Sequence, residues 1–269
     1  MKRVDNIHSS KRIFMDLDVV TKCHSPYIIK CLGYFISFDY IDICMEPMIT
    51  CFDKILNLYG KGLPEKVLSK MTFSVLSALD YLKEKHKLMH RDIKPSNILM
   101  DIHGNVKLCD FGISGQLIDS QAQTMSKGST AYLAPERISV DLVLASSPPM
   151  YDIRADVWSL GVTIVQLASG RFPYHGYNSV FELMIKIHEE PPPSLEMNQG
   201  FSTPLCDFVS DCLHKNMEER PKFKALLYKP FVQKEFWNNF ETGKWYREEC
   251  MDNPIDARNL DGDLVDLHI

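Results

Sequence analysis

The sequence predicts an α+β fold of two lobes, in which a small β-containing lobe precedes a larger, mainly helical lobe. Two β-rich runs, residues 31–37 and 40–46, come early in the chain and are joined by a tight turn. Apolar residues recur with helical spacing over residues 65–86, and the pattern after Tyr132 is mostly helical. The chain has 269 residues, 45% of them apolar, which is enough for one large or two small domains with an ample core.

The first expected element is a helix that begins after residues 8–10. Asp16 lies within its apolar stripe, so its carboxylate either reaches water at the edge of the stripe or faces inward and pairs with a cation. The stripe follows the spacing i, i+3, i+4 and i+7, at Ile13, Asp16, Leu17 and Val20. Only two strands are expected before residue 49. Because two strands alone are marginally stable in water, the first lobe is expected to be incomplete within this chain.

The later elements are expected to be a long helix, a hairpin and further helices. The helix over residues 65–86 has Pro64 at its start and a long apolar face. Residues 98–100 and 106–109 flank His-Gly-Asn, a turn sequence that indicates a hairpin. The most apolar stretch, residues 157–168, is too short to span a bilayer and is typical of a buried helix.

Composition limits the classes of partner and compartment. The net charge of −5 argues against a nucleic-acid partner and against a basic membrane-binding surface. The eight cysteines include no C-x-x-C pair, which is typical of reduced thiols in an intracellular protein. No apolar core of a signal peptide follows Lys2 and Arg3. We therefore expect a cytoplasmic location, with the nucleus as an alternative.

Two motifs carry the chemistry. Residues 90–97 read His-Arg-Asp-Ile-Lys-Pro-Ser-Asn, and residues 110–112 read Asp-Phe-Gly. Phosphoryl transfer from ATP needs a base that orients the hydroxyl, metal ions that neutralise the phosphates, and a cation near the developing charge. Asp92 is the expected base, and Lys94 is the expected cation. Asn97 and Asp110 are the expected ligands of Mg²⁺, which prefers oxygen.

With these motifs the chain resembles the eukaryotic protein kinases over nearly its whole length. Within that family it resembles the MAP kinase kinases, most closely the stress-activated branch that activates c-Jun N-terminal kinases. Besides the catalytic motifs, Cys before Asp-Phe-Gly and Ile-Ser-Gly after it are typical of this group. The resemblance is carried by residues 11–20, 90–99, 108–115, 131–137 and 152–161. It implies ATP and Mg²⁺ as cofactors, a MAP kinase as substrate and an upstream MAP kinase kinase kinase as activator.

The resemblance also implies regulatory positions. Ser120 and Thr124 match the activating phosphorylation sites of the family, with Ser126 and Ser129 as rival acceptors. Each phosphate adds nearly two negative charges, and Arg91 is the matching cation that would receive one.

Four further positions match structural residues of the family. Ser129 is interpreted as a hydroxyl that contacts the catalytic loop. Glu136 and Arg220 match a buried ion pair, and Asp156 matches an anchor of the catalytic-loop backbone.

The adenine site is implied by the same resemblance. Met45, Glu46 and Met48 match the gatekeeper and the hinge, where adenine bonds to the backbone, and Leu99 matches the floor of the pocket. Cys51 follows the hinge and is either a core thiol or a thiol that electrophiles reach at the mouth of the pocket.

The chain departs from the family pattern at its start. It contains no glycine-rich phosphate loop and no matching strand lysine, so Asp16, the matching helix acid, has no partner within these residues. Two explanations stay open: a longer gene product, or a short form that binds partners without catalysis. The expected divisions are a partial first lobe and hinge over residues 1–49, a second lobe over 50–231, and a docking segment with an acidic tail over 232–269.

That last segment is rich in aromatic side chains. They either pack back on the second lobe or form a docking surface for the upstream kinase, since aromatic residues are favoured interface anchors. The residues are Phe236, Trp237, Phe240, Trp245 and Tyr246.

Overall fold

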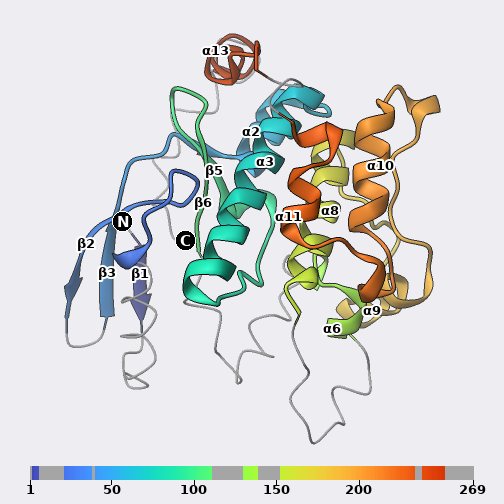
Figure 1. The fold of residues 1–269 in the computed structure, drawn as a ribbon, viewed down its shortest axis with the longest axis horizontal. Helices are drawn as coiled ribbons and strands as arrows, with labels where there is room; N and C mark the ends of the chain where they lie inside the picture. The colour runs from blue at the N-terminus through green and yellow to red at the C-terminus, as the bar shows by residue number, and fades with distance from the viewer. Residues whose placement is uncertain are drawn as a thin grey trace, which may run out of the picture.

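A computed structural model describes residues 2–5, 21–37, 40–110, 130–138, 152–233 and 238–251. A small sheet lies at one end of the molecule and the helices lie at the other, with a second small sheet between them (Figure 1). The predicted α+β, two-lobed fold is therefore confirmed. The helix expected over residues 11–20 lies outside the described residues.

The first sheet has three antiparallel strands in the order β1-β3-β2. They are β1 (Lys2–Asp5), β2 (Cys31–Ile36) and β3 (Tyr40–Met45). The prediction of only two strands before the hinge is wrong, because β1 pairs along β3 with Lys2 opposite Ile43. The four residues of β1 show no alternation of apolar and polar side chains, so local sequence gave no signal for a strand formed by long-range pairing.

The second sheet joins the hinge to the catalytic loop. Its order is β4-β5-β6, with β4 (Thr50–Cys51), β5 (Ile98–Met100) and β6 (Val106–Leu108). The predicted hairpin is confirmed by the pairing of β5 with β6. β4 has only two residues and was not predicted, because a strand that short has no periodicity.

Helices build the larger lobe. The predicted long helix is confirmed as α3 followed by a π-helical turn. The helices are α2 (Phe52–Tyr59), α3 (Glu65–Tyr81), α6 (Pro135–Ile138), α8 (Arg154–Ser169), α9 (Val180–Glu189), α10 (Thr203–Cys212), α11 (Phe223–Leu227) and α13 (Thr242–Tyr246). The short turns are η2 (Leu82–His86), η3 (Pro95–Asn97), η4 (Met197–Gln199), η5 (Met217–Glu219), η6 (Pro230–Val232) and η7 (Arg247–Met251).

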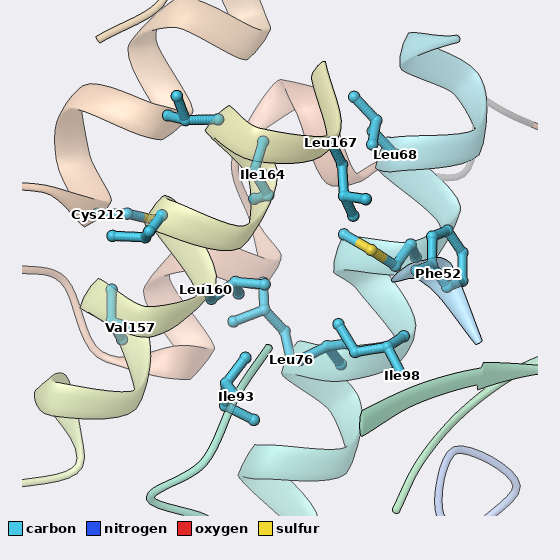
Figure 2. Close-up of a cluster of buried hydrophobic side chains, with 14 of the residues drawn as sticks. Phe52, Leu68, Leu76, Ile93, Ile98, Val157, Leu160, Ile164, Leu167 and Cys212 are labelled. Carbon is cyan, nitrogen blue, oxygen red and sulfur yellow. The ribbon is translucent and has the colours of Figure 1, made fainter. Parts of the chain in front are cut away.

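The core of the larger lobe lies between α3 and α8 (Figure 2). Leu68 and Leu76 of α3 face Leu160, Ile164 and Leu167 of α8, and all of them are buried. Nearly every residue of α8 is buried, as expected for the most apolar stretch of the sequence. Within the described ranges, the structure has no helix with the length and apolar character that crossing a membrane requires.

Residues 238–251 pack on the larger lobe. Trp245 is only 9% exposed, and its ring meets the ring of Tyr59 in α2 at a centroid distance of 5.3 Å. Arg247 donates from Nη1 to the carbonyl of Ile102 at 2.8 Å, in the turn between β5 and β6. For Trp245 and Tyr246, which is also buried, the structure therefore favours the packing alternative; Phe236 and Trp237 lie outside the described residues.

Candidate active site

The catalytic loop is hydrogen-bonded to the N-terminal end of α8. Asp156 in the first turn of α8 accepts hydrogen bonds from the backbone N–H groups of His90 at 2.9 Å and Arg91 at 2.7 Å. Asp156 is buried, with 1% of its surface exposed. Its hydrogen bond to His90 is buried, and its hydrogen bond to Arg91 is partly buried. A charged acceptor for two such donors makes strong hydrogen bonds, so Asp156 fixes the path of the loop.

His90 joins the loop to the end of β6. Its Nε2 lies 2.8 Å from the carbonyl oxygen of Cys109, so Nε2 carries the hydrogen and donates it. The other ring nitrogen, Nδ1, accepts from the backbone N–H of Asp92 at 3.3 Å. The neighbouring residue Arg91 has a φ of 69°, a left-handed conformation that is strained for a side chain of this size.

Three predicted catalytic residues come together around one carboxylate. Lys94 Nζ lies 2.8 Å from Asp92 Oδ2. The side-chain amide of Asn97 donates to the backbone oxygen and to Oδ2 of Asp92, both at 2.8 Å. Both N–H groups of the amide are thereby engaged, which leaves Asn97 Oδ1 as the oxygen that a metal ion could bind.

Asp110 lies at the end of β6, next to the catalytic loop. The preceding N–H, that of Cys109, donates to the carbonyl of Asn97 at 3.0 Å. Asp110 itself has a φ of 63°, again in the left-handed region. Asp110 and Asn97 both offer oxygen atoms, which fits the preference of Mg²⁺ for a few protein oxygens completed by substrate phosphates. In the described part of the chain, no three or more His, Cys, Asp or Glu side chains form a group that could hold a metal ion.

The predicted adenine site has an apolar floor. Leu99, Ile29 and Cys109 form a buried cluster, and the partly buried side chains of Met45 and Met48 pack against it. Cys51 packs against the same cluster and is half-buried. For the described residues, the Met48 N–H and the Glu46 carbonyl have no hydrogen-bond partner within the protein, so both are open to a ligand.

The predicted ion pair joins Glu136 of α6 to Arg220. Arg220 donates to both carboxylate oxygens of Glu136 at 2.7 Å, in a bidentate arrangement. The arginine side chain is fully buried and also donates to the carbonyl of His214 at 2.6 Å. Its guanidinium lies over the ring of Trp158, 5.1 Å from the centroid.

Tyr132 lies in the turn that precedes α6 and is half-buried. Burial raises the pKa of its phenol well above the usual range, and the charges of Asp53 and Asp92 raise it further. The phenol therefore stays protonated and donates to Oε1 of Gln166 at 2.5 Å.

Some predicted residues lie outside the described part of the chain, and several ion pairs were not predicted. Asp16, Ser120, Thr124 and Ser129 lie outside the described residues, so their roles stay predictions. One unpredicted ion pair joins Glu46 and Lys107, whose charged atoms approach to 2.6 Å. The only signal in the sequence was a lysine between two apolar residues of a short strand, which does not name a partner.

Comparison with known proteins identifies the family of the chain. Residues 1–232 match the protein kinase domain family. The chain is 49% identical over 260 residues to the dual specificity mitogen-activated protein kinase kinase hemipterous of Drosophila melanogaster, covering 96% of this chain and 22% of that protein. It is 47% identical over 249 residues to dual specificity mitogen-activated protein kinase kinase 7 of Homo sapiens, covering 92% of this chain and 59% of that protein.

A third relative is matched over more of its length. The chain is 42% identical over 254 residues to the dual specificity mitogen-activated protein kinase kinase mek-1 of Caenorhabditis elegans, covering 93% of this chain and 71% of that protein. The chain therefore belongs to the protein kinase family and, within it, to the MAP kinase kinases. It spans 22% of the length of the fly relative and 59% of the human one.

Proposed function

We propose that the chain carries the catalytic site of a dual-specificity MAP kinase kinase. It transfers the γ-phosphate of ATP to Thr and Tyr in the activation loop of a stress-activated MAP kinase of the c-Jun N-terminal kinase type. The single observation that carries this proposal is the arrangement of Lys94 and Asn97 around Asp92, on a loop anchored by Asp156. The printed names of the relatives, dual specificity mitogen-activated protein kinase kinases, support the same reaction.

The proposed roles follow from the positions of the polar atoms. Asp92 accepts the proton of the substrate hydroxyl as its oxygen forms a bond to the γ-phosphorus, while the bond to the β-phosphate oxygen breaks and ADP leaves. Lys94, whose Nζ lies 2.8 Å from Asp92 Oδ2, supplies positive charge beside that carboxylate and near the transferred phosphate. Asn97 holds the Asp92 carboxylate in one orientation through its amide.

Asn97 Oδ1 and the Asp110 carboxylate are the groups that would hold magnesium. The ion, when bound, neutralises the phosphate oxygens of ATP. The carbonyl of Glu46 and the N–H of Met48 would bind adenine over the floor formed by Leu99.

Activation and location belong to the same proposal. Phosphorylation of Ser120 and Thr124 by an upstream MAP kinase kinase kinase would add charge that Arg91 receives. The C-terminal region, residues 232–269, is the proposed docking segment for that kinase. A cytoplasmic location is supported by eight cysteines that are all free thiols.

The test is phosphate transfer by the protein expressed from its native gene and activated by an upstream kinase. The unmodified protein should transfer labelled phosphate to an inactive c-Jun N-terminal kinase, and Asp92→Asn should abolish transfer while sparing nucleotide binding. Asp110→Asn should instead weaken magnesium-dependent nucleotide binding. Near-normal turnover in both variants would show that the roles are wrong.

A second candidate is a non-catalytic module that binds a MAP kinase or its activator. This alternative requires that no glycine-rich loop and strand lysine precede these 269 residues in the native protein. Sequencing the 5′ end of the native transcript separates the two: upstream codons for both features favour the enzyme, and a stop codon favours the module.

A further inference from the structure

We propose that the side chains of Glu46 and Lys107 are a positioning pair for ATP. The pair holds the hinge backbone, which would bind adenine, in register with β6. Two residues after β6 comes Asp110, which would bind the phosphate end through magnesium. This inference rests on the proposed function. It assigns a role to two side chains whose function was not predicted from the sequence, because only the backbone of Glu46 was expected to act.

Glu46 is fastened to the adjacent segment by two hydrogen bonds. Its backbone N–H donates to the carbonyl of Lys30 at 3.0 Å, and its Oε1 accepts from the N–H of Lys30 at 2.7 Å. These bonds close a ring between residues 30 and 46. Because the ring includes both the side chain and the main chain of Glu46, the side chain fixes the orientation of its own peptide groups. The Glu46 carbonyl and, two residues later, the Met48 N–H are the groups open to adenine.

Lys107 reaches the same oxygen from the other side. It lies in the middle of β6, between the buried residues Val106 and Leu108, and its Nζ is 2.6 Å from Glu46 Oε1. The side chains of Lys107 and Glu46 are 16% and 23% exposed, respectively. A charge-assisted bond at this depth is screened less than a surface ion pair, so it can hold the two segments together.

The strand that carries Lys107 is itself tied to its surroundings. The N–H of Ile29 donates to Leu108 O at 3.0 Å, and the N–H of Leu108 donates to Tyr27 O at 2.8 Å. Two residues after Leu108 comes Asp110. The segment 27–30 is therefore bonded to β6 on one side and to Glu46 on the other, and the ion pair closes this frame directly.

The two ends of ATP would bind to the two segments that the ion pair joins. Adenine would bind at the hinge, and the phosphates would bind near Asp110, so ATP gains full affinity only when both ends are held at the correct separation. Loss of the ion pair leaves each end intact but lets the hinge and β6 shift relative to each other. The expected result is weaker ATP binding with little change in the chemical step.

The test is a double-mutant cycle in the protein expressed from its native gene. Lys107→Met should raise KM for ATP by about fivefold to tenfold, a range typical of coupled neighbours, while kcat changes by less than about threefold. Glu46→Ala should raise KM at least as much, because it also removes the bond to Lys30. The double variant should match Glu46→Ala within about twofold, since the pair acts as one unit.

The control is an ion pair far from the hinge. Lys186→Met, which removes the partner of Glu190 in the more exposed i,i+4 pair of α9, should leave KM for ATP unchanged. An unchanged KM in Lys107→Met, multiplicative effects in the double variant, or parallel losses of kcat and melting temperature would each overturn the inference. If the unmodified protein transfers no phosphate, the proposed function fails instead, and the same cycle is judged by the Kd for ATP.

Discussion

The anchor at Asp156 gives the sharpest prediction about stability. Asp156→Ala removes the acceptor of two backbone N–H groups, those of His90 and Arg91, at 2.9 and 2.7 Å. Each buried donor left without a partner costs about 1–3 kcal/mol, so the free energy of unfolding should fall by about 2–6 kcal/mol. This is a large share of the roughly 5–15 kcal/mol that stabilises a typical domain.

The assay is denaturant unfolding of the unmodified protein and its variants. Asp156→Asn keeps one oxygen acceptor, so its loss of stability should fall between those of the unmodified protein and Asp156→Ala. Glu190→Ala, which removes an exposed partner of Lys186, is the matched control and should change stability by no more than about 0.5 kcal/mol.

The same variants report on catalysis, because Asp92 directly follows the two anchored residues, His90 and Arg91. If Asp156→Asn folds, its kcat should fall while its KM changes little, since the loop that positions Asp92 is loosened. Equal, small losses of stability in Asp156→Ala and Glu190→Ala would refute the reasoning, since the two backbone donors would then not depend on the carboxylate.

Three further predictions concern other parts of the chain. Arg220→Ala leaves Glu136 without its bidentate partner, and unfolding measurements should detect a loss of about 3–5 kcal/mol; a loss below about 1 kcal/mol would contradict the pair's structural role. Trp245→Ala should lower the melting temperature, because the ring is buried against Tyr59, whereas Trp237→Ala should weaken affinity for an upstream kinase without changing melting if the docking proposal holds. The 269-residue chain by itself should transfer phosphate far below about 1–100 per second, and turnover in that range would show that the glycine-rich loop and strand lysine are dispensable.

Local sequence was enough to predict the catalytic loop and the hairpin behind it. The residues from His90 to Asn97 are close in the chain, so the grouping of Lys94 and Asn97 around Asp92 follows from their spacing. The hairpin of β5 and β6 was predicted for the same reason, because its turn residues are adjacent to both strands.

Contacts between distant segments could not be predicted in this way. β1 exists because it pairs with β3, and its own four residues indicate no strand. The ion pair between Glu46 and Lys107 joins residues far apart in the chain, and neither residue is unusual in its local context. The close approach of Gly243 to Gly104 is similar: a Cβ on Gly104 would lie 2.4 Å from the backbone nitrogen of Gly243. Only the folded chain brings the turn between β5 and β6 against α13.

The central claim is that Asp92 and its neighbours transfer phosphate to a MAP kinase. The most direct measurement is mass spectrometry of an inactive c-Jun N-terminal kinase after incubation with ATP, magnesium and the activated protein expressed from its native gene. We expect phosphate on both the Thr and the Tyr of the activation loop, and none when Asp92→Asn replaces the unmodified protein. Phosphate on neither residue, or equal phosphorylation by the variant, would contradict it.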